Sequence, residues 1–254
     1  MISRWARPEE LPALQGLWEH CFGDGPEVSG AFFERFPPET HTRIVDREGI
    51  AAMASWMPVT LEGEAGAYVY AVATAPERRG RGLCRTLMGE LEDALAAQGL
   101  AFTALCPAEP SLFEFYSRIG YETAFYRRTW QAAAGDREAA LTPVGPSEYG
   151  ALREAYLQTP HCVWDEAALA YLQATGTRFY QLPDGCAAVS TLQNGKIRIV
   201  ELLGPEKNAA ALCRRLGAAC AEVSTPGMER ARGMVKSLRF GQKTPPAYLG
   251  FAFD

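Results

Sequence analysis

Two glycines separated by one residue, Gly80 and Gly82, lie among four arginines, and this pattern is typical of a site for a negatively charged group. Glycine lets the backbone approach a ligand closely, so that successive N–H groups can converge on one anion. A helix that begins after the second glycine would add the partial positive charge of its N-terminus. The arginines, whose guanidinium groups bind phosphate oxygens in pairs of hydrogen bonds, are Arg78, Arg79, Arg81 and Arg85. We therefore predict that this loop holds a diphosphate.

Taken alone, the same segment could be a flexible turn before a helix, with its arginines in solvent. Two other phosphate-binding motifs fit it less well. A Walker loop needs G-x-x-x-x-G-K-[ST], which the chain does not contain. A dinucleotide-binding fingerprint needs G-x-G-x-x-G directly after a strand. Here Arg85 holds the third glycine position, and residues 76–79 separate the expected strand from the first glycine.

The loop resembles the acyl-CoA-binding loop of the GNAT superfamily of N-acyltransferases. The family pattern Q/R-x-x-G-x-G/A falls on residues 77–82, with Glu77 at the first position, a departure that a loop acting through its backbone can tolerate. A second family pattern, F-Y-x-x-x-G-F/Y, matches residues 115–121. The resemblance covers residues 1–130, and it implies an α/β fold with a mixed, mostly antiparallel sheet flanked by helices.

The resemblance also implies roles for residues on both sides of the loop. The strand before the loop would separate from its neighbour and pair with the pantetheine arm. The N–H of Val72 would donate to the thioester carbonyl, whose oxygen gains negative charge during the reaction. Tyr116 would be the general acid that protonates the leaving thiolate, or else an aromatic packing residue. The cofactor-binding residues predicted in this way are Val72, Ala73, Thr74, Arg78, Arg79, Gly80, Arg81, Gly82, Leu83, Cys84 and Arg85.

The general base is not assigned by spacing. Many family members carry Asn seven residues before the tyrosine, but here the position is Glu109, and a carboxylate there would favour a cationic amine. Glu62 and Glu64, before the predicted central strand, are further candidates. The enhanced-intracellular-survival acetyltransferases, which this chain partly resembles, bring a C-terminal carboxylate to the site. By that resemblance Asp254, at the end of an apolar segment expected to form a strand, is also a candidate base.

The elements that must position these residues follow from hydrophobic periodicity. Residues 67–74 are apolar on both faces of a strand, which indicates a central position in the sheet. Residues 83–98 have the spacing of an amphipathic helix. Strands over 100–106 and 121–130 enclose a helix over 111–119. Before the loop, the pattern predicts helices after Pro8 and over 28–36, then strands over 41–46 and 50–61 that form a hairpin.

The second half of the chain repeats features of the first at a nearly constant offset. Leu152, Ala155 and Tyr156 repeat the spacing of an early helix, and residues 185–189 resemble residues 49–53. Chance in a chain rich in Ala and Leu is the alternative to duplication. We predict a cofactor-binding domain at 1–130, a linker at 131–145 and a degenerate second domain at 146–254, in which residues 204–207 replace the glycine loop. Residues 230–233, which follow Pro226 and Gly227, are expected to form a solvated turn rather than a basic loop for an anionic substrate.

Composition limits the classes of function. The chain has 254 residues, with 25 Lys and Arg against 30 Asp and Glu and a formal net charge of -5, which argues against nucleic-acid binding. Its apolar runs are too short to span a membrane, and its start does not resemble a signal peptide. The 7 cysteines are scattered and the 3 histidines are few, so we expect reduced thiols and no metal site. A cytoplasmic location is expected.

These observations predict an enzyme that moves an acetyl group from acetyl-CoA to a primary amine by direct attack, with the second unit shaping the acceptor cleft. A non-catalytic acyl-CoA-binding sensor or interaction protein is the alternative, because no base is assigned. A third interpretation is another acyl donor with the same mechanism. The acceptor can be a polyamine, an aminoglycoside, an amino acid or a peptide N-terminus, since no motif distinguishes them. Whether the chain forms a homo-oligomer is left open.

Overall fold

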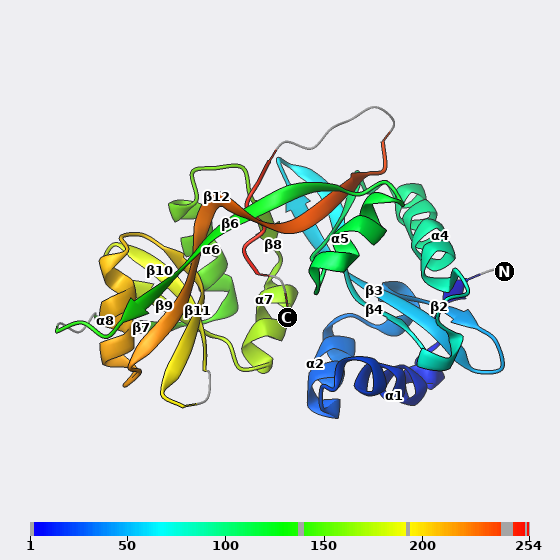
Figure 1. The fold of residues 1–254 in the computed structure, drawn as a ribbon, viewed down its shortest axis with the longest axis horizontal. Helices are drawn as coiled ribbons and strands as arrows, with labels where there is room; N and C mark the ends of the chain where they lie inside the picture. The colour runs from blue at the N-terminus through cyan, green and yellow to red at the C-terminus, as the bar shows by residue number, and fades with distance from the viewer. Residues whose placement is uncertain (1–2, 137–139, 192–193, 240–245, 252, 254) are drawn as a thin grey trace. The chain divides into compact units, whose positions relative to one another are not determined.

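The computed structural model describes residues 3–136, 140–191, 194–239, 246–251 and 253 (Figure 1). The chain divides into two compact units. The first consists of Met1–Glu122 and Met234–Thr244, and the second of Thr123–Gly233 and Pro245–Asp254. Both units are mixed α/β structures in which antiparallel strand pairs predominate, as the sequence predicts. In the part of the chain that the structure describes, no helix is both long and apolar enough to cross a membrane.

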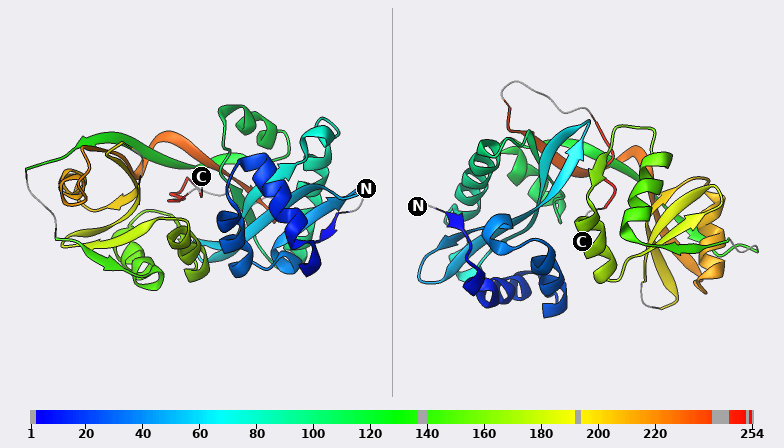
Figure 2. Two further views of the ribbon diagram at one scale, coloured as in Figure 1. Left: turned by 90° about the horizontal axis from the view of Figure 1, so that it is seen from below. Right: turned by 180° about the vertical axis from the view of Figure 1, so that it is seen from behind.

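The first unit has a sheet in the order β1-β2-β3-β4-β5-β12, in which only the β4–β5 pair is parallel. Helices α1 and α2 cover one face, and α4 and α5 cover the other (Figures 1 and 2). The elements in chain order are β1 (Arg4–Trp5), a 3₁₀ helix (Pro8–Glu10), α1 (Leu11–Phe22), α2 (Pro26–Arg35), α3 (Pro38–His41), β2 (Thr42–Asp46), β3 (Ile50–Leu61), β4 (Glu64–Thr74), a 3₁₀ helix (Pro76–Arg78), α4 (Leu83–Ala97), β5 (Phe102–Leu105) and α5 (Pro110–Ser117). The predicted hairpin of β2 and β3 and the predicted helix at α4 are confirmed.

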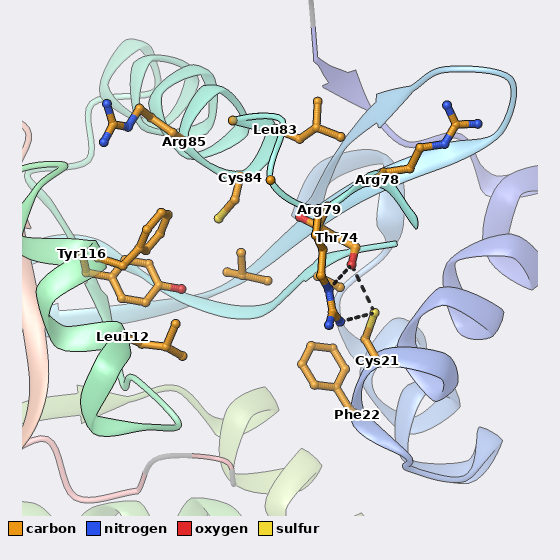
Figure 3. Close-up of a pocket in the computed structure, with 15 residues that line it drawn as sticks. Cys21, Phe22, Thr74, Arg78, Arg79, Leu83, Cys84, Arg85, Leu112 and Tyr116 are labelled. Carbon is orange, nitrogen blue, oxygen red and sulfur yellow. Dashed lines mark hydrogen bonds between the residues drawn. The ribbon is translucent and has the colours of Figure 1, made fainter. Parts of the chain in front are cut away.

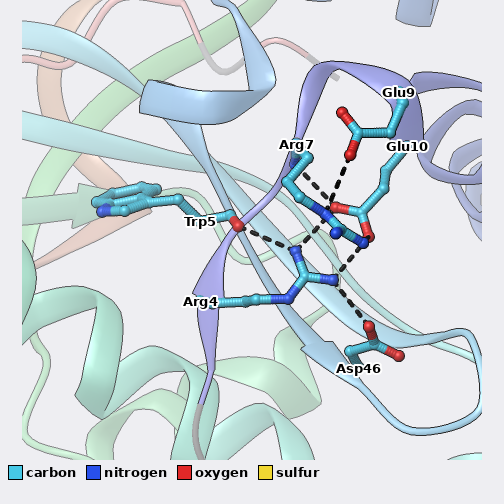
Figure 4. Close-up of polar contacts among 6 residues, drawn as sticks. All are labelled: Arg4, Trp5, Arg7, Glu9, Glu10 and Asp46. Atoms are coloured by element: carbon cyan, nitrogen blue, oxygen red, sulfur yellow. Dashed lines mark hydrogen bonds and ion pairs between the residues drawn. The ribbon is translucent and has the colours of Figure 1, made fainter.

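Strand β1 has only two residues, and a cluster of charged side chains helps to hold it in place. The Arg4 guanidinium donates to both carboxylate oxygens of Glu10, at 2.6 and 2.9 Å, and to Asp46 at 2.8 Å (Figure 4). Arg7 adds a backbone hydrogen bond to Glu10 at 2.8 Å. These hydrogen bonds hold the pKa of Glu10 well below its usual range. The cluster joins the start of the chain to the end of β2.

Helix α4 lies over the sheet because one side of it is apolar. Leu83, Leu87, Leu91 and Leu95 recur at helical spacing, and all are buried in the core of the first unit. The helix begins after Gly82 and ends close to Gly99, and both glycines have positive φ angles, of 73° and 89°. Its N-terminus therefore points to the end of β4.

Two long strands connect the units. Strand β6 (Glu122–Ala133) starts at the boundary, and Ala132 near its end is buried in the core of the second unit. Strand β12 (Cys220–Ser237) pairs at its start with β11 (Lys196–Leu203), while Met234–Ser237 at its end pair with β5 of the first unit. The first unit thus contains a strand segment, Met234–Ser237, that follows Thr123–Gly233 of the second unit in the chain.

The predicted turn at residues 230–233 is wrong, because these residues lie inside β12. Pro226 and Gly227, which motivated the turn, are also part of this strand. Tertiary pairing at both ends of β12 outweighs the local preference of these two residues. Arg230 is exposed, in agreement with its expected solvation.

Lys236 anchors the end of β12 in the first unit. Its Nζ lies 2.5 Å from a carboxylate oxygen of buried Glu92 and donates to the carbonyl of Ile119 at 2.8 Å. The ammonium group also lies 5.9 Å from the centre of the Tyr121 ring. Burial raises the pKa of Glu92 even though the lysine opposes this shift.

The second unit repeats the order of the first. Two antiparallel hairpin connections lead through β9, β10 and β11, and a helix then crosses to the parallel strand β12, as α4 crosses from β4 to β5. The predicted tandem arrangement is therefore confirmed. The elements are β7 (Thr142–Val144), α6 (Pro146–Tyr156), β8 (Cys162–Trp164), α7 (Glu166–Ala174), β9 (Arg178–Leu182), β10 (Gly185–Thr191), β11 (Lys196–Leu203) and α8 (Lys207–Arg215).

The C-terminal segment forms isolated bridges instead of the expected strand. Ala247 pairs with Phe125 and Tyr248 pairs with His161, both inside the second unit. Asp254, the candidate base at the chain end, lies outside the described residues.

Candidate functional site

Among the described residues, the end of β4 has no strand partner on the side of β5. The two strands pair only where Gly66–Tyr68 meet Phe102–Ala104, although β4 continues to Thr74. Ala71 has a φ of 51°, and the register between β3 and β4 shifts at the same place. Such a bulge bends a strand and ends its pairing. The final residues of β4 therefore have one open edge, as the resemblance implies.

Backbone geometry shows which groups face this open edge. The N–H of Ala75 donates to the carbonyl of Ala51 at 3.0 Å. In an antiparallel pair every second residue directs its N–H and C=O to the partner strand. Ala73 therefore also faces β3, whereas Val72 and Thr74 turn their N–H and C=O groups away from β3. These groups of Val72 and Thr74 face the open edge of β4, and the Thr74 carbonyl there accepts from Arg79 and Cys21.

The glycine loop continues directly from this edge into α4. Gly80 and Gly82 have φ angles of 74° and 73°, and a Cβ atom at either position would meet nothing within 4 Å. The backbone conformation, and not crowding, is therefore what favours glycine here. Gly82 provides no side chain to cap the helix. The N–H groups of the first turn of α4 thus remain available to an anion.

The open edge and the loop border one cavity of about 660 Å³ (Figure 3). Most of the predicted cofactor-binding residues meet here, and so does the predicted general acid. Those that line the cavity are Val72, Ala73, Thr74, Arg78, Arg79, Gly80, Gly82, Leu83, Cys84, Arg85 and Tyr116. Arg81 does not line it, and its guanidinium instead donates to the carbonyl of Glu77 at 3.3 Å.

Tyr116 turns its hydroxyl into the cavity from α5 (Figure 3). Its ring packs edge-on against Phe115 and Tyr121, with ring centres 5.1 and 5.6 Å apart, and the residue is 7% exposed. Burial, with a smaller contribution from Cys84, raises the pKa of the Tyr116 hydroxyl above its ordinary value. The hydroxyl therefore keeps its proton at neutral pH and can donate it.

Cys84 lies in the first turn of α4, and its side chain faces the same cavity. Burial raises the pKa of its thiol to about 11. Because the thiolate is the nucleophilic form of cysteine, this residue is inert at neutral pH. The environment of Cys84 favours a packing role.

No carboxylate of the described residues lines the cavity. Glu109 precedes α5 as an exposed residue, Glu64 pairs with Arg239 at 2.8 Å, and Glu62 lies in an exposed turn. The structure thus brings none of these three candidate bases into the cavity. In addition, no group of three or more His, Cys, Asp or Glu side chains among the described residues is placed to hold a metal ion.

Four cavity residues were not assigned to the site from the sequence. Cys21 and Phe22 come from the last turn of α1, and Leu112 and Phe115 come from α5. Phe22 is 44% exposed although it follows an apolar helix face. An exposed aromatic residue at the end of such a helix face is a signal that could have indicated the wall of a ligand cavity.

The second unit differs from the first at the start of α8, the helix that connects β11 to the parallel strand β12. Gly204 lies so close to the backbone of Asp184 that a Cβ atom would come within 2.5 Å of the Asp184 carbonyl oxygen. The Asp184 carboxylate accepts from Asn208 at 2.8 Å and lies 3.3 Å from the Lys207 ammonium. The N-terminus of α8 therefore has a carboxylate of the chain itself beside it.

Comparison with known proteins agrees with this geometry. Residues 3–124 match the family model of the acetyltransferase (GNAT) domain. No protein of the curated set matches the chain significantly in sequence.

Several solved structures share the fold over both units. A GCN5-related N-acetyltransferase from Anabaena variabilis is 17% identical with a TM-score of 0.74, covering 94% of this chain and 73% of its own. One from Kribbella flavida is 20% identical with a TM-score of 0.70, covering 93% and 72%. Eis1 from Mycobacterium abscessus is 14% identical with a TM-score of 0.69, covering 94% and 74%. These likenesses establish the fold of the tandem units.

Proposed function

We propose, from the premise that residues 3–124 belong to the GNAT acetyltransferase family, that this protein transfers an acetyl group from acetyl-CoA to a primary amine. One observation carries the proposal. The open edge of β4 and the uncapped start of α4 border the same cavity, so that one ligand can pair with a strand and place a diphosphate at a helix N-terminus. Acyl-CoA has both parts in this order.

In the proposed reaction the amine attacks the thioester carbonyl directly. The N–H of Val72 donates to the carbonyl oxygen as negative charge develops on it. The carbon–sulfur bond then breaks, and Tyr116 supplies the proton that the leaving thiolate takes up. The attacking nitrogen loses its proton to a base, for which water or Asp254 is a candidate. The products are an acetamide and free CoA.

The cofactor assignment is tested by charge at one loop position. Gly82→Asp places a carboxylate beside the expected diphosphate, in open space. Gly82→Asn is the matched control, because Asn has the same size, tolerates the left-handed conformation and carries no charge. We expect the Asp variant to bind acetyl-CoA at least about tenfold more weakly than the Asn variant in isothermal titration. Equal affinities would overturn the assignment.

A non-catalytic acyl-CoA sensor is the second candidate function. The specific observation in its favour is that, within the part of the chain that the structure describes, no carboxylate lines the cavity. Release of free thiol from acetyl-CoA should be measured with polyamines, aminoglycosides, amino acids and peptide N-termini as acceptors. Turnover with any of these amines supports the enzyme, whereas tight acetyl-CoA binding without turnover on the whole panel supports the sensor.

A further inference from the structure

Arg79 closes one end of the open strand edge with its own side chain. Its Nε donates to the carbonyl of Thr74 at 3.2 Å, and its Nη2 lies 4.0 Å from the sulfur of Cys21 (Figure 3). The Cys21 thiol also donates to the Thr74 carbonyl, at 3.7 Å. A carbonyl oxygen has two lone pairs. Both acceptor positions of Thr74 are therefore used inside the protein.

The carbonyl of Thr74 is one of the few polar groups that face away from β3. A pantetheine arm that pairs with this edge would place an amide N–H against it. The ligand and the Arg79 side chain therefore compete for the same acceptor. This competition rests on the proposed function.

A ligand that carries phosphate would offer Arg79 a second partner. It directly precedes Gly80, and it lines the same cavity as the start of α4. A hydrogen bond from a guanidinium to a phosphate oxygen is stronger than one to a neutral carbonyl. An anion at the loop would therefore draw Arg79 away from Thr74.

We propose that Arg79 makes the site selective for phosphate-bearing donors. Without an anion it covers the Thr74 carbonyl, and with a diphosphate at the loop it releases that carbonyl to the pantetheine arm. A pantetheine thioester without phosphate must break the Arg79–Thr74 contact and gains nothing in exchange. The donor class is thus a nucleotide thioester such as acyl-CoA, and short phosphate-free thioesters are poor donors.

Arg85 supplies a matched control. It also lines the cavity, but in the part of the chain that the structure describes no hydrogen bond joins it to Thr74. Figure 3 shows Arg85 extending away from Cys21, whereas Arg79 extends toward it. Loss of Arg85 would remove positive charge without uncovering the strand edge.

The proposal predicts opposite effects on two ligands. Arg79→Ala should weaken acetyl-CoA binding and, at the same time, tighten the binding of phosphate-free acetyl-pantetheine by about three- to tenfold, the usual net effect of one hydrogen bond. Arg85→Ala should weaken acetyl-CoA and leave acetyl-pantetheine within about twofold of wild type. Titration followed by protein-observed NMR measures both ligands, including weak ones.

Inorganic pyrophosphate gives an independent test of the coupling. Saturating pyrophosphate should tighten acetyl-pantetheine binding to the wild-type protein and to Arg85→Ala, but not to Arg79→Ala, because coupling between two ligands is reciprocal. If the wild-type protein binds no acetyl-CoA, the proposed function itself is wrong. If it binds acetyl-CoA, but pyrophosphate leaves the affinity for acetyl-pantetheine unchanged, the role of Arg79 is overturned and the cofactor assignment stands.

Discussion

Burial decides what each cavity side chain can do chemically. The Tyr116 hydroxyl and the Cys84 thiol face the same space, and desolvation raises the pKa of both. For Tyr116 as a general acid, the shift keeps the proton on the hydroxyl over the whole neutral range and also makes the hydroxyl a weaker proton donor. For Cys84 the raised pKa prevents a nucleophilic role, because the reactive thiolate is not formed at neutral pH. The same burial therefore leaves Tyr116 able to act as a proton donor and leaves Cys84 without the thiolate that a nucleophile needs.

Replacement of Tyr116 by Phe tests the acid role. The change removes the proton donor and keeps the ring, so we expect kcat to fall roughly 10²- to 10³-fold. Because the folded-state pKa of Tyr116 is raised, the acid is lost only as pH rises through a value above 10. Below about pH 10, deprotonation of Tyr116 should therefore not lower the wild-type rate. In this pH range the rates of wild type and Tyr116→Phe should change with pH in the same way. An unchanged kcat would leave Tyr116 with packing alone.

Cys84 should be dispensable for turnover. We expect Cys84→Ala to keep kcat within about threefold of wild type, because a thiol with a pKa of about 11 offers no nucleophile at pH 7.5. Alkylation of Cys84 by iodoacetamide, followed by mass spectrometry, should be slow at pH 7.5 and accelerate toward pH 10. Rapid alkylation at pH 7.5 would contradict the raised pKa.

At the scale of elements, the short parallel contact of β4 with β5 holds the open edge in place. Gly66 is in this contact, and a Cβ atom there would lie 2.4 Å from the ring of Phe102. We expect Gly66→Ala to lower the free energy of unfolding by about 1–3 kcal/mol, because a core ring must move. Denaturant unfolding measures this change.

Gly16 in the exposed middle of α1 is the control for that substitution. A Cβ atom there meets nothing within 4 Å. Gly16→Ala should raise stability by up to about 1 kcal/mol through helix propensity. If the two alanine variants had equal stability, the contact between Gly66 and Phe102 would not matter for the fold.

Lys236 gives a prediction with a pH dependence. Lys236→Met leaves buried Glu92 without its ammonium partner, and we expect a loss of about 1–3 kcal/mol, reduced because the lysine is partly exposed. Since the folded-state pKa of Glu92 is raised, folding favours its protonated form, and stability is lost as pH rises through that pKa. The variant should therefore be less destabilised at pH 5 than at pH 8. Chemical denaturation at the two pH values measures this difference, and equal losses would contradict it.

Local patterns predicted the elements that local interactions determine. The leucines of α4 and the two positive-φ glycines of the loop are visible in the sequence, and so is the match around Tyr116. The pairing of Met234 with Leu105 is not visible, because it depends on contacts between distant parts of the chain. For the same reason β12 was read as a turn at residues 230–233. Cys21 and Phe22 were missed because α1 shows its buried stripe but not what its last turn faces.

At the scale of the whole molecule, the two units share one fold but differ at the start of the helix that connects their two parallel strands. The first has an uncapped helix start beside four arginines, while the second places Asp184 beside the start of α8. We expect isothermal titration to find one acetyl-CoA per chain. Gly82→Asp should weaken this binding at least about tenfold, and a remaining site of wild-type affinity in that variant would assign a ligand to the second unit.

The late position of Met234–Ser237 in the chain also has a consequence during synthesis of the protein. Strand β5 leaves the ribosome long before residues 234–237, which complete its other edge. At about 5–20 residues per second, that edge stays unpaired for on the order of 10 s during synthesis. An unpaired strand edge invites pairing with other chains. The nascent first unit therefore needs shielding until the last strand arrives, and a fragment ending near residue 130 keeps this exposed edge permanently.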